Sequence, residues 1–145
     1  MSKAPNGIFY IEDVRRERLT PLGVETLIKN TASQDGRSVS ITVPKDPSQA
    51  GKWQAQQLVL MLATYIAKAI PPTGNKEQRA KAFAAQAEAG NVKLVRGDWN
   101  ETYLSEIASF PTGSHDDQVD ASSDAFNELV LGDDFDLATF VKANR

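Results

Sequence analysis

The sequence has no cysteine and a single histidine, His115, among its 145 residues. The first absence excludes disulfides, thiolate metal sites and a cysteine nucleophile, and the second excludes a zinc site built from several histidines. The sequence also lacks an apolar run long enough to span a membrane and a signal-peptide pattern at its start. These absences predict a cytoplasmic protein, and they leave oxygen ligands as the basis of any metal site.

Positive charge is missing from one long segment. No Lys or Arg occurs between Glu101 and Asp136, whereas residues 1–100 carry most of the basic side chains, and the formal net charge is −3. A metal-dependent nuclease needs such a split, with acids gathered at the metals and bases spread along the phosphate path. A solvated acidic helix followed by an acidic tail explains the same composition, so both interpretations stay open.

Hydrophobic periodicity and turn residues predict alternating strands and helices. We expect strands at residues 8–16, 38–43, 66–70 and 91–95, and helices that begin at residues 21, 49, 76, 100 and 114. Residues 1–7 are expected to be a flexible lead-in and residues 132–145 a C-terminal tail with a short helix around 137–141. The alternation predicts one α/β domain over residues 1–145, with a partly parallel sheet.

The predicted core includes apolar residues of the first two helices. Leu22, Val24, Leu27, Ile28 and Thr31 are expected to form the buried side of the first helix. The run Leu58 to Leu62 predicts a largely buried second helix, and Trp53 on that helix is expected in the core, with stacking on a nucleobase as the alternative. Trp99 suits either a core position or stacking on a nucleobase.

The segment from Ser114 to Leu129 is the most informative stretch. As a helix it places Asp116 and Asp120 (i, i+4) close together, with Val119, Phe126 and Val130 on an adjoining apolar face. Asp46 follows the strand at residues 38–43, where open α/β sheets form their ligand crevice. If the last helix crosses that end of the sheet, three carboxylates converge in a way that suits Mg²⁺ or Mn²⁺. The alternative is that Asp46 is a turn residue and Asp116 a helix cap.

Basic side chains near loops are candidate phosphate contacts. His115 precedes the acids and could donate a proton or orient a phosphate, although a surface histidine at a helix start explains it equally well. The segment 73–76 is not a P-loop, because the string GxxxxGK[ST] is absent. Ordinary solvated helix surface remains the alternative for the basic set, which comprises Lys45, Lys52, Lys76, Arg79, Lys81 and Arg96.

Several strings occur together in a familiar order: FYIEDVRRER, KDPSQAGK, PPTGNKEQRAKAFAAQAEAGNVKLVRGDWN and FPTGSHDDQVDASSDAFN. In these motifs the sequence resembles the C-terminal nuclease domain of the phage terminase large subunit, the DNA-packaging enzyme of tailed phages and prophages. The resemblance covers roughly residues 8–130. It implies an RNase H-like mixed sheet flanked by helices, and a two-metal endonuclease that uses Mg²⁺ or Mn²⁺ to cut concatemeric double-stranded DNA during packaging.

The resemblance also implies roles for individual residues. Asp46 and Asp116 match the family's metal-binding acids, and Asp120 is the acid one turn later in the same motif. Asp117 belongs to the motif, but the helix wheel turns it away from Asp116. The residues expected to contact the DNA backbone are Lys45, Lys52, Lys76, Arg79 and His115.

Two features of the family are absent from these 145 residues. In the family two further strands precede the strand at residues 8–16, the first with a catalytic Asp, and an ATPase domain carries the nucleotide-binding loop. We therefore expect a truncated, incomplete metal site, for which Asp13 is a weak substitute, and an unpaired sheet edge that could form a homodimer. The alternative function is a non-catalytic module that docks to DNA, a portal or a small terminase subunit. A junction resolvase would share the fold but not the motifs.

Overall fold

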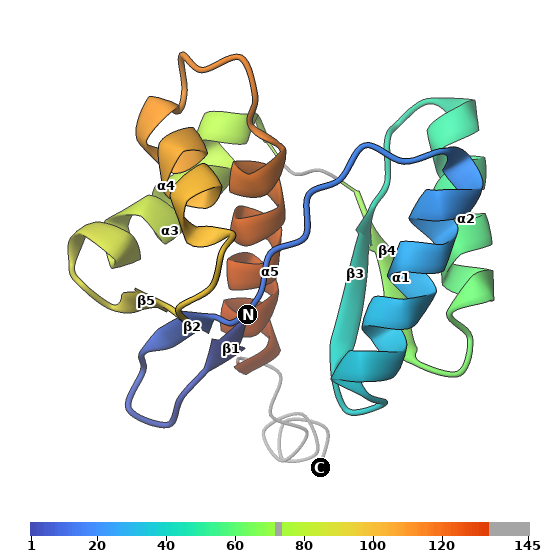
Figure 1. The fold of residues 1–145 in the computed structure, drawn as a ribbon, viewed down its shortest axis with the longest axis horizontal. Coiled ribbons are helices and arrows are strands. Elements are labelled where there is room, and N and C mark those ends of the chain that lie inside the picture. The colour runs from blue at the N-terminus through green and yellow to red at the C-terminus, as the bar shows by residue number, and fades with distance from the viewer. Residues whose placement is uncertain (72–73, 134–145) are drawn as a thin grey trace, which may run out of the picture. The chain divides into compact units, whose positions relative to one another are not determined.

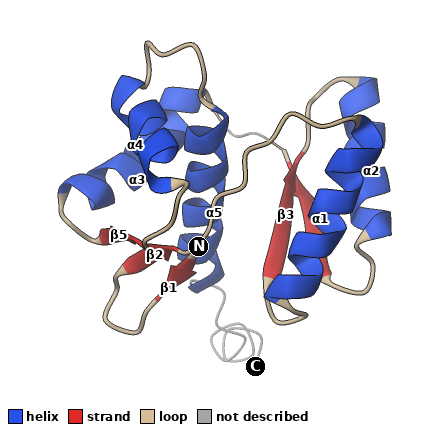
Figure 2. Ribbon diagram, in the orientation of Figure 1, coloured by secondary structure: helices blue, strands red, loops and turns tan. Residues whose placement is uncertain are grey.

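The computed structural model describes residues 1–71 and 74–133 (Figures 1 and 2). The contacts divide them into two compact units. The first unit contains residues 1–16 and the described residues from Gly74 onward, and the second begins at Glu17 and includes the segment up to Ile70. The elements in chain order are β1 (Ser2–Lys3), β2 (Phe9–Ile11), α1 (Pro21–Asp35), β3 (Ser40–Pro44), α2 (Gln49–Met61), β4 (Ile66–Ile70), α3 (Lys76–Glu88), β5 (Val92–Leu94), α4 (Asn100–Ser109) and α5 (Asp117–Asp133).

The first unit packs α3, α4 and α5 around a three-stranded sheet of order β1-β2-β5. Strand β2 pairs parallel with β5, so that Phe9 lies opposite Val92, and antiparallel with β1. As the alternation predicts, Phe9 and Ile11 share the buried face of β2. The Phe126 ring of α5 lies 4.7 Å from Phe9 and 5.8 Å from Phe83 of α3, between ring centroids. This aromatic core fixes α5 against α3, the helix pair that carries most of the predicted site.

The second unit is a parallel β3–β4 pair packed against α2, with α1 preceding it in the chain (Figure 2). Its register places Ser40 opposite Ile66 and Val43 opposite Ala69. The connection from β3 through α2 to β4 is a βαβ unit, the connection that parallel strands require. Asp46 lies in the loop between β3 and α2, directly after the carboxyl end of β3.

Burial in the second unit differs from the prediction. Leu22 is 73% exposed, Trp53 is 65% exposed and Leu60 is 60% exposed, so the predicted core positions of these three side chains are wrong, and Val24 is exposed as well. The buried residues within α1 and α2 are the small Ala32 and Ala55, and Leu62, which follows α2, is fully buried as predicted. Trp53 and Val24 border an open cleft of about 480 Å³ between α1 and α2. Apolar character alone therefore did not identify which stripe of each helix is covered.

Smaller corrections concern the ends of elements. Ser2–Lys3 pairs with β2, so part of the predicted flexible lead-in is a strand. The strand predicted at residues 8–16 covers only Phe9–Ile11, and Val130 on α5 is exposed rather than part of the apolar face. The predicted helix near residues 137–141 lies outside the described residues. Among the described helices none is both long enough and apolar enough to span a membrane.

Candidate functional site

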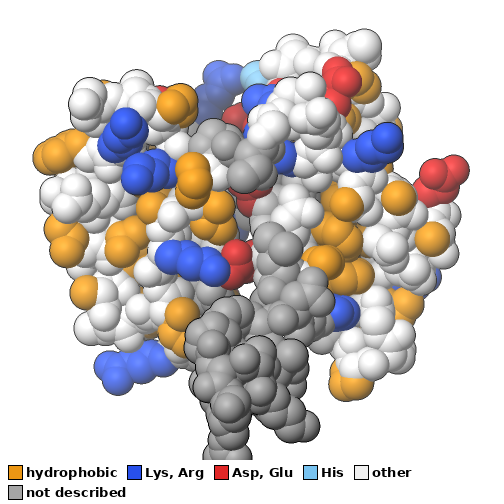
Figure 3. All heavy atoms as spheres, turned by 180° about the vertical axis from the view of Figure 1, so that it is seen from behind, with side chains coloured by type: hydrophobic (Ala, Val, Ile, Leu, Met, Phe, Trp, Pro, Cys, Tyr) orange, Lys and Arg blue, Asp and Glu red, His pale blue; other side chains and the backbone are white. Residues whose placement is uncertain are grey.

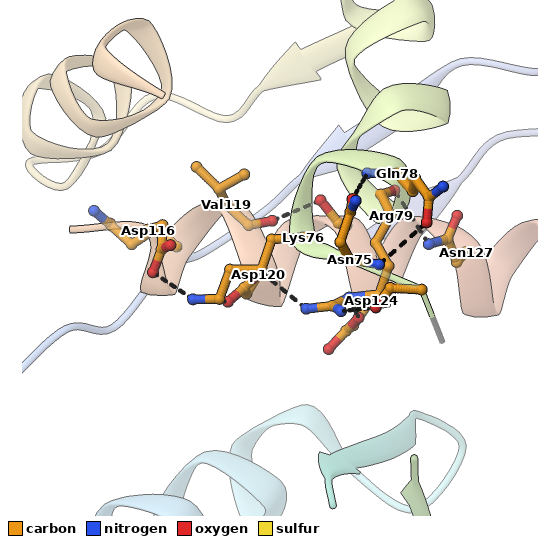
Figure 4. Close-up of polar contacts among 12 residues, drawn as sticks. Asn75, Lys76, Gln78, Arg79, Asp116, Val119, Asp120, Asp124 and Asn127 are labelled. Carbon is orange, nitrogen blue, oxygen red and sulfur yellow. Dashed lines mark hydrogen bonds and ion pairs between the residues drawn. The ribbon is translucent and has the colours of Figure 1, made fainter. Parts of the chain in front are cut away.

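Three carboxylates, two on α5 and one from the residue directly before it, meet two cationic side chains of α3 along the contact between these helices (Figure 4). Asp116, Asp120 and Asp124 follow one another at intervals of four residues, so they form one stripe on the helix. Lys76 and Arg79 project from the first turn of α3 onto this stripe. The cluster is therefore an alternating ladder of acids and bases, with one more acid than base.

The start of α3 is fixed by a capping box. The Asn75 side chain accepts a hydrogen bond from Gln78 N (2.8 Å), and the Gln78 side chain accepts one from Asn75 N (3.2 Å). Gly74 has φ +67°, a conformation that favours glycine, and a Cβ there would lie 2.6 Å from Gln78 Oε1. Arg79 Nη1 also donates to Gly74 O at 3.3 Å. These local contacts, which the sequence signalled through Asn75, orient Lys76 and Arg79 toward α5.

Lys76 bridges the two predicted metal ligands on α5. Its Nζ lies 2.8 Å from Asp116 Oδ1 and 2.9 Å from Asp120 Oδ2. The hydrogen bonds that Lys76 donates to Asp116 and then to Asp120 raise the pKa of Lys76 above its ordinary value, so the ammonium stays charged. The two carboxylates thus share one cation position, as predicted from their spacing, and in this structure that position belongs to the lysine.

Arg79 occupies the more buried end of the ladder. Its side chain is 13% exposed, with Nη2 lying 3.2 Å from Asp120 Oδ1 and Nε 3.7 Å from Asp124 Oδ1. The Nε atom is buried and has no hydrogen-bond partner within the described part of the chain. Burial raises the pKa of Asp124, and repulsion from Asp120 adds to this, whereas the Arg79 charge lowers it. Asp124 was not predicted, although its i, i+4 spacing from Asp120 was a usable signal.

The donor chemistry of Asp116 and Asp120 fits a divalent ion. Mg²⁺ is usually held by one or two carboxylates, with waters and substrate phosphates completing the octahedron. Two carboxylates that already converge on one ammonium supply that minimum. Over residues 1–71 and 74–133, however, no group of three or more His, Cys, Asp or Glu side chains could hold a metal ion. The geometry thus offers two protein ligands for one ion.

Asp46, the third predicted ligand, makes a local turn. Its Oδ1 accepts a hydrogen bond from Ser48 N at 2.7 Å, and Ser48 in turn caps α2 by accepting one from Gly51 N. Hydrogen bonds from Ser48 lower the pKa of Asp46. A Cβ on Gly51 would collide with Asp46 Cβ, so glycine at this position lets the acid lie against the first turn of α2. The convergence of Asp46 with Asp116 stays a prediction, because the two residues belong to different units.

The other predicted DNA contacts occupy varied environments. Lys52 is exposed on α2, and Lys45 donates its backbone N–H to Ile70 O at 2.8 Å. His115 is exposed and lines a cleft of about 390 Å³ together with Arg16 and Glu106. Figure 3 shows Lys and Arg side chains among polar and apolar surface. The DNA-binding role of these residues stays a prediction.

Glu106 is a buried acid that the sequence did not reveal. It lies on α4, its side chain is 4% exposed, and it accepts hydrogen bonds from the Gln118 backbone N–H (2.6 Å) and from Gln118 Nε2 (2.7 Å). Its local sequence is that of an ordinary helix surface. Only the tertiary contact with the start of α5 distinguishes it.

A family model described as a terminase RNaseH-like domain matches residues 1–129. The chain belongs to the terminase RNaseH-like domain family. This match confirms the predicted resemblance and the RNase H-like α/β fold, and it identifies the chain as a nuclease-type module of a terminase. No curated protein and no solved structure matches the chain. The matched range includes every residue predicted for the site, so the terminase assignment covers both Asp46 and the α5 acids.

Proposed function

We propose that this terminase RNaseH-like domain is a metal-dependent DNA endonuclease, which hydrolyses phosphodiester bonds of concatemeric double-stranded DNA during packaging by a terminase large subunit. The observation that carries the proposal is the single cation position shared by Asp116 and Asp120. In a nuclease-type fold, two carboxylates directed at one cation supply ligands of the kind that Mg²⁺ or Mn²⁺ prefers, and such ions can promote phosphodiester cleavage.

Asp116 and Asp120 would hold the ion, with Asp46 as the third ligand. A bound Mg²⁺ or Mn²⁺ would supply an activated water and would stabilise charge on the phosphate oxygens. Lys76 has to leave the two carboxylates before they can accept the ion, and its ammonium is then free to contact a DNA phosphate. Lys45, Lys52, Arg79 and His115 are proposed as further backbone contacts, whose contribution should weaken as salt concentration rises.

A nicking assay on supercoiled plasmid tests the proposal directly. Wild-type protein should nick the plasmid with Mn²⁺ and not with EDTA, and Asp116→Asn should abolish this activity. Asp117→Asn is the matched control, because it removes the same charge from the neighbouring, exposed residue. Equal nicking by the wild-type protein and the Asp116→Asn variant would remove Asp116 from the site.

The neutralised state of the acids favours a second candidate function. Lys76 and Arg79 already balance most of the charge on Asp116, Asp120 and Asp124, as expected of a non-catalytic module that binds DNA or another packaging protein. Calorimetric titration with Mn²⁺ separates the two functions. The nuclease should show a saturable site that Asp116→Asn removes, and the binding module should show none.

Strand β3 offers a place for self-association. Among the described residues of its unit, β3 pairs with β4 alone, so alternate backbone groups of residues 40–44 have no strand partner there. We include in the proposal a homodimer formed through this edge. Light scattering coupled to size-exclusion chromatography should then give a mass that rises with concentration, and a constant monomer mass would count against the dimer.

A further inference from the structure

The start of α5 determines where the Asp116 carboxylate can point. The Asp116 carbonyl accepts the first helical hydrogen bond, from Asp120 N at 2.9 Å, so Asp116 is the N-cap residue of α5. An aspartate at this position ordinarily turns its side chain back to accept the N–H of the second or third helical residue, here Gln118 or Val119. A carboxylate used in that way would face the backbone rather than a cation shared with Asp120.

Glu106 accepts the first of these N–H groups instead. Its Oε1 lies 2.6 Å from Gln118 N, and its Oε2 lies 2.7 Å from Gln118 Nε2. Burial alone would raise the pKa of Glu106, but the hydrogen bonds from Gln118, with the charge of Arg16, lower it overall. Arg16 Nη1 lies 3.6 Å from Oε2. An ionised carboxylate from α4 therefore caps α5 from outside the helix.

The consequence is visible at Asp116. In the described part of the chain its carboxylate has one hydrogen-bond partner, the Lys76 ammonium at 2.8 Å, and it makes no bond to the backbone of α5. We propose that Glu106 is a positioning residue: by capping α5 from α4, it leaves the Asp116 carboxylate free to bind a cation together with Asp120. The identity of that cation as Mg²⁺ or Mn²⁺ rests on the proposed function, whereas the capping geometry does not.

Four variants separate this role from general packing between α4 and α5. Glu106→Ala removes the cap, and Glu106→Asp shortens it by one methylene, so that it no longer reaches Gln118 N. Glu106→Gln keeps an oxygen that can accept the backbone N–H. Tyr103→Phe is the matched control, since it removes another buried hydrogen bond between the same two helices, Tyr103 to Ser122 at 2.8 Å, without touching the start of α5.

The first measurement needs no metal. NMR couplings through hydrogen bonds identify the acceptor of the Gln118 backbone N–H. In the wild-type protein the coupling should run to the Glu106 carboxyl carbon, and in Glu106→Ala and Glu106→Asp it should move to the Asp116 carboxyl carbon. Coupling to Asp116 in the wild-type protein, or no move in either variant, would overturn the proposal. Glu106→Asp keeps the test decisive if the alanine variant does not fold.

The second measurement is the Mn²⁺ dissociation constant, followed by electron paramagnetic resonance. In Glu106→Ala and Glu106→Asp the Asp116 carboxylate should cap the α5 backbone, and this hydrogen bond competes with the metal. Mn²⁺ binding should therefore weaken about 3- to 30-fold. Glu106→Gln should restore most of the affinity, and Tyr103→Phe should match the wild type. Equal weakening by Tyr103→Phe would overturn the positioning role. Coupling to Glu106 with no saturable Mn²⁺ site in the wild-type protein would refute the proposed function and still support the role of Glu106 as the cap.

Discussion

Asp46 and Asp116 each precede a helix of their own unit, Asp46 two residues before the Ser48 cap of α2 and Asp116 as the N-cap of α5, and their carboxylates have different partners. Asp46 uses Oδ1 to accept the N–H of Ser48, two residues away. At the start of α5 it is Glu106, twelve residues from Gln118 in sequence, that accepts the Gln118 backbone N–H. The Asp116 carboxylate instead binds Lys76 of α3. A carboxylate that accepts a hydrogen bond from its own turn already has a partner. A carboxylate whose helix is capped by another residue keeps its charge available for a cation. The comparison indicates that Asp116 is the better preorganised of the two proposed metal ligands.

The strongest test of this comparison is a double-mutant cycle on Asp46 and Asp116. Asp46→Asn and Asp116→Asn should each weaken Mn²⁺ binding by at least about 100-fold, since loss of even an outer partner of a metal site costs 10- to 100-fold. If both acids bind the same ion, the double variant should bind no more weakly than the single variants. Isothermal titration calorimetry measures all four proteins. Additive losses would show that the two acids are not coupled through one ion.

Gly51→Ala tests whether Asp46 lies against the first turn of α2. Alanine normally favours a helix over glycine, but here its Cβ would collide with Asp46 Cβ. The variant should therefore lower the free energy of unfolding by about 1–3 kcal/mol, as overpacking does. Urea denaturation checks this, with the exposed Gln56→Ala on the same helix as control. A stabilised Gly51→Ala variant would show that Asp46 does not lie against α2.

Lys76→Met tests whether the Asp116 carboxylate is available for a metal ion. Removing the ammonium that bridges Asp116 and Asp120 leaves their shared cation position open, so Mn²⁺ affinity should rise about three- to tenfold, the range expected from partly exposed ion pairs. The same variant should bind DNA less tightly if Lys76 contacts phosphate. Lys81→Met, which removes an exposed lysine from α3, is the control and should leave Mn²⁺ affinity unchanged.

The smallest expected effect is on how the free energy of unfolding depends on pH under acidic conditions. Because the folded-state pKa of Glu106 is lowered, its stabilising contribution is complete above the ordinary glutamate pKa of about 4.3 and is lost as pH falls through the lower folded value. Glu106→Gln should therefore show a shallower loss of stability below that pH than the wild-type protein. Thermal unfolding between pH 2 and 6 would measure the difference, and identical profiles would contradict the assigned cap.

Local signals in the sequence predicted the local features of the site. Asn75 identified the start of α3, the apolar pattern gave β4 its observed bounds, and the i, i+4 spacing brought Asp116 and Asp120 to one cation. The β2 face with Phe9 and Ile11 followed from simple alternation. In each case the determining interaction lies within one turn or one strand, which is the range over which sequence pattern is informative.

Features that depend on distant contacts were not predictable in this way. The exposure of Leu22 and Trp53 depends on which helix stripe is covered, and the roles of Glu106 and Arg79 depend on how α3 and α4 pack against α5. For Arg79 the alternative of solvated helix surface is wrong, because its side chain is largely buried between Asp120 and Asp124. The alternative reading of Asp46 as a turn residue is confirmed for its local geometry.

Helix α5 has a further consequence for how this surface can evolve. Its first turns present Asp116 and Asp120 to α3, while Phe126, farther along, is locked between Phe9 and Phe83. One inserted residue between these two segments would rotate the acids by about 100° relative to the aromatic anchor. Substitutions can therefore change the chemistry of this helix while its packing is kept. Insertions or deletions between its two halves would turn the acids away from α3, so the length of this segment is more tightly constrained than its composition.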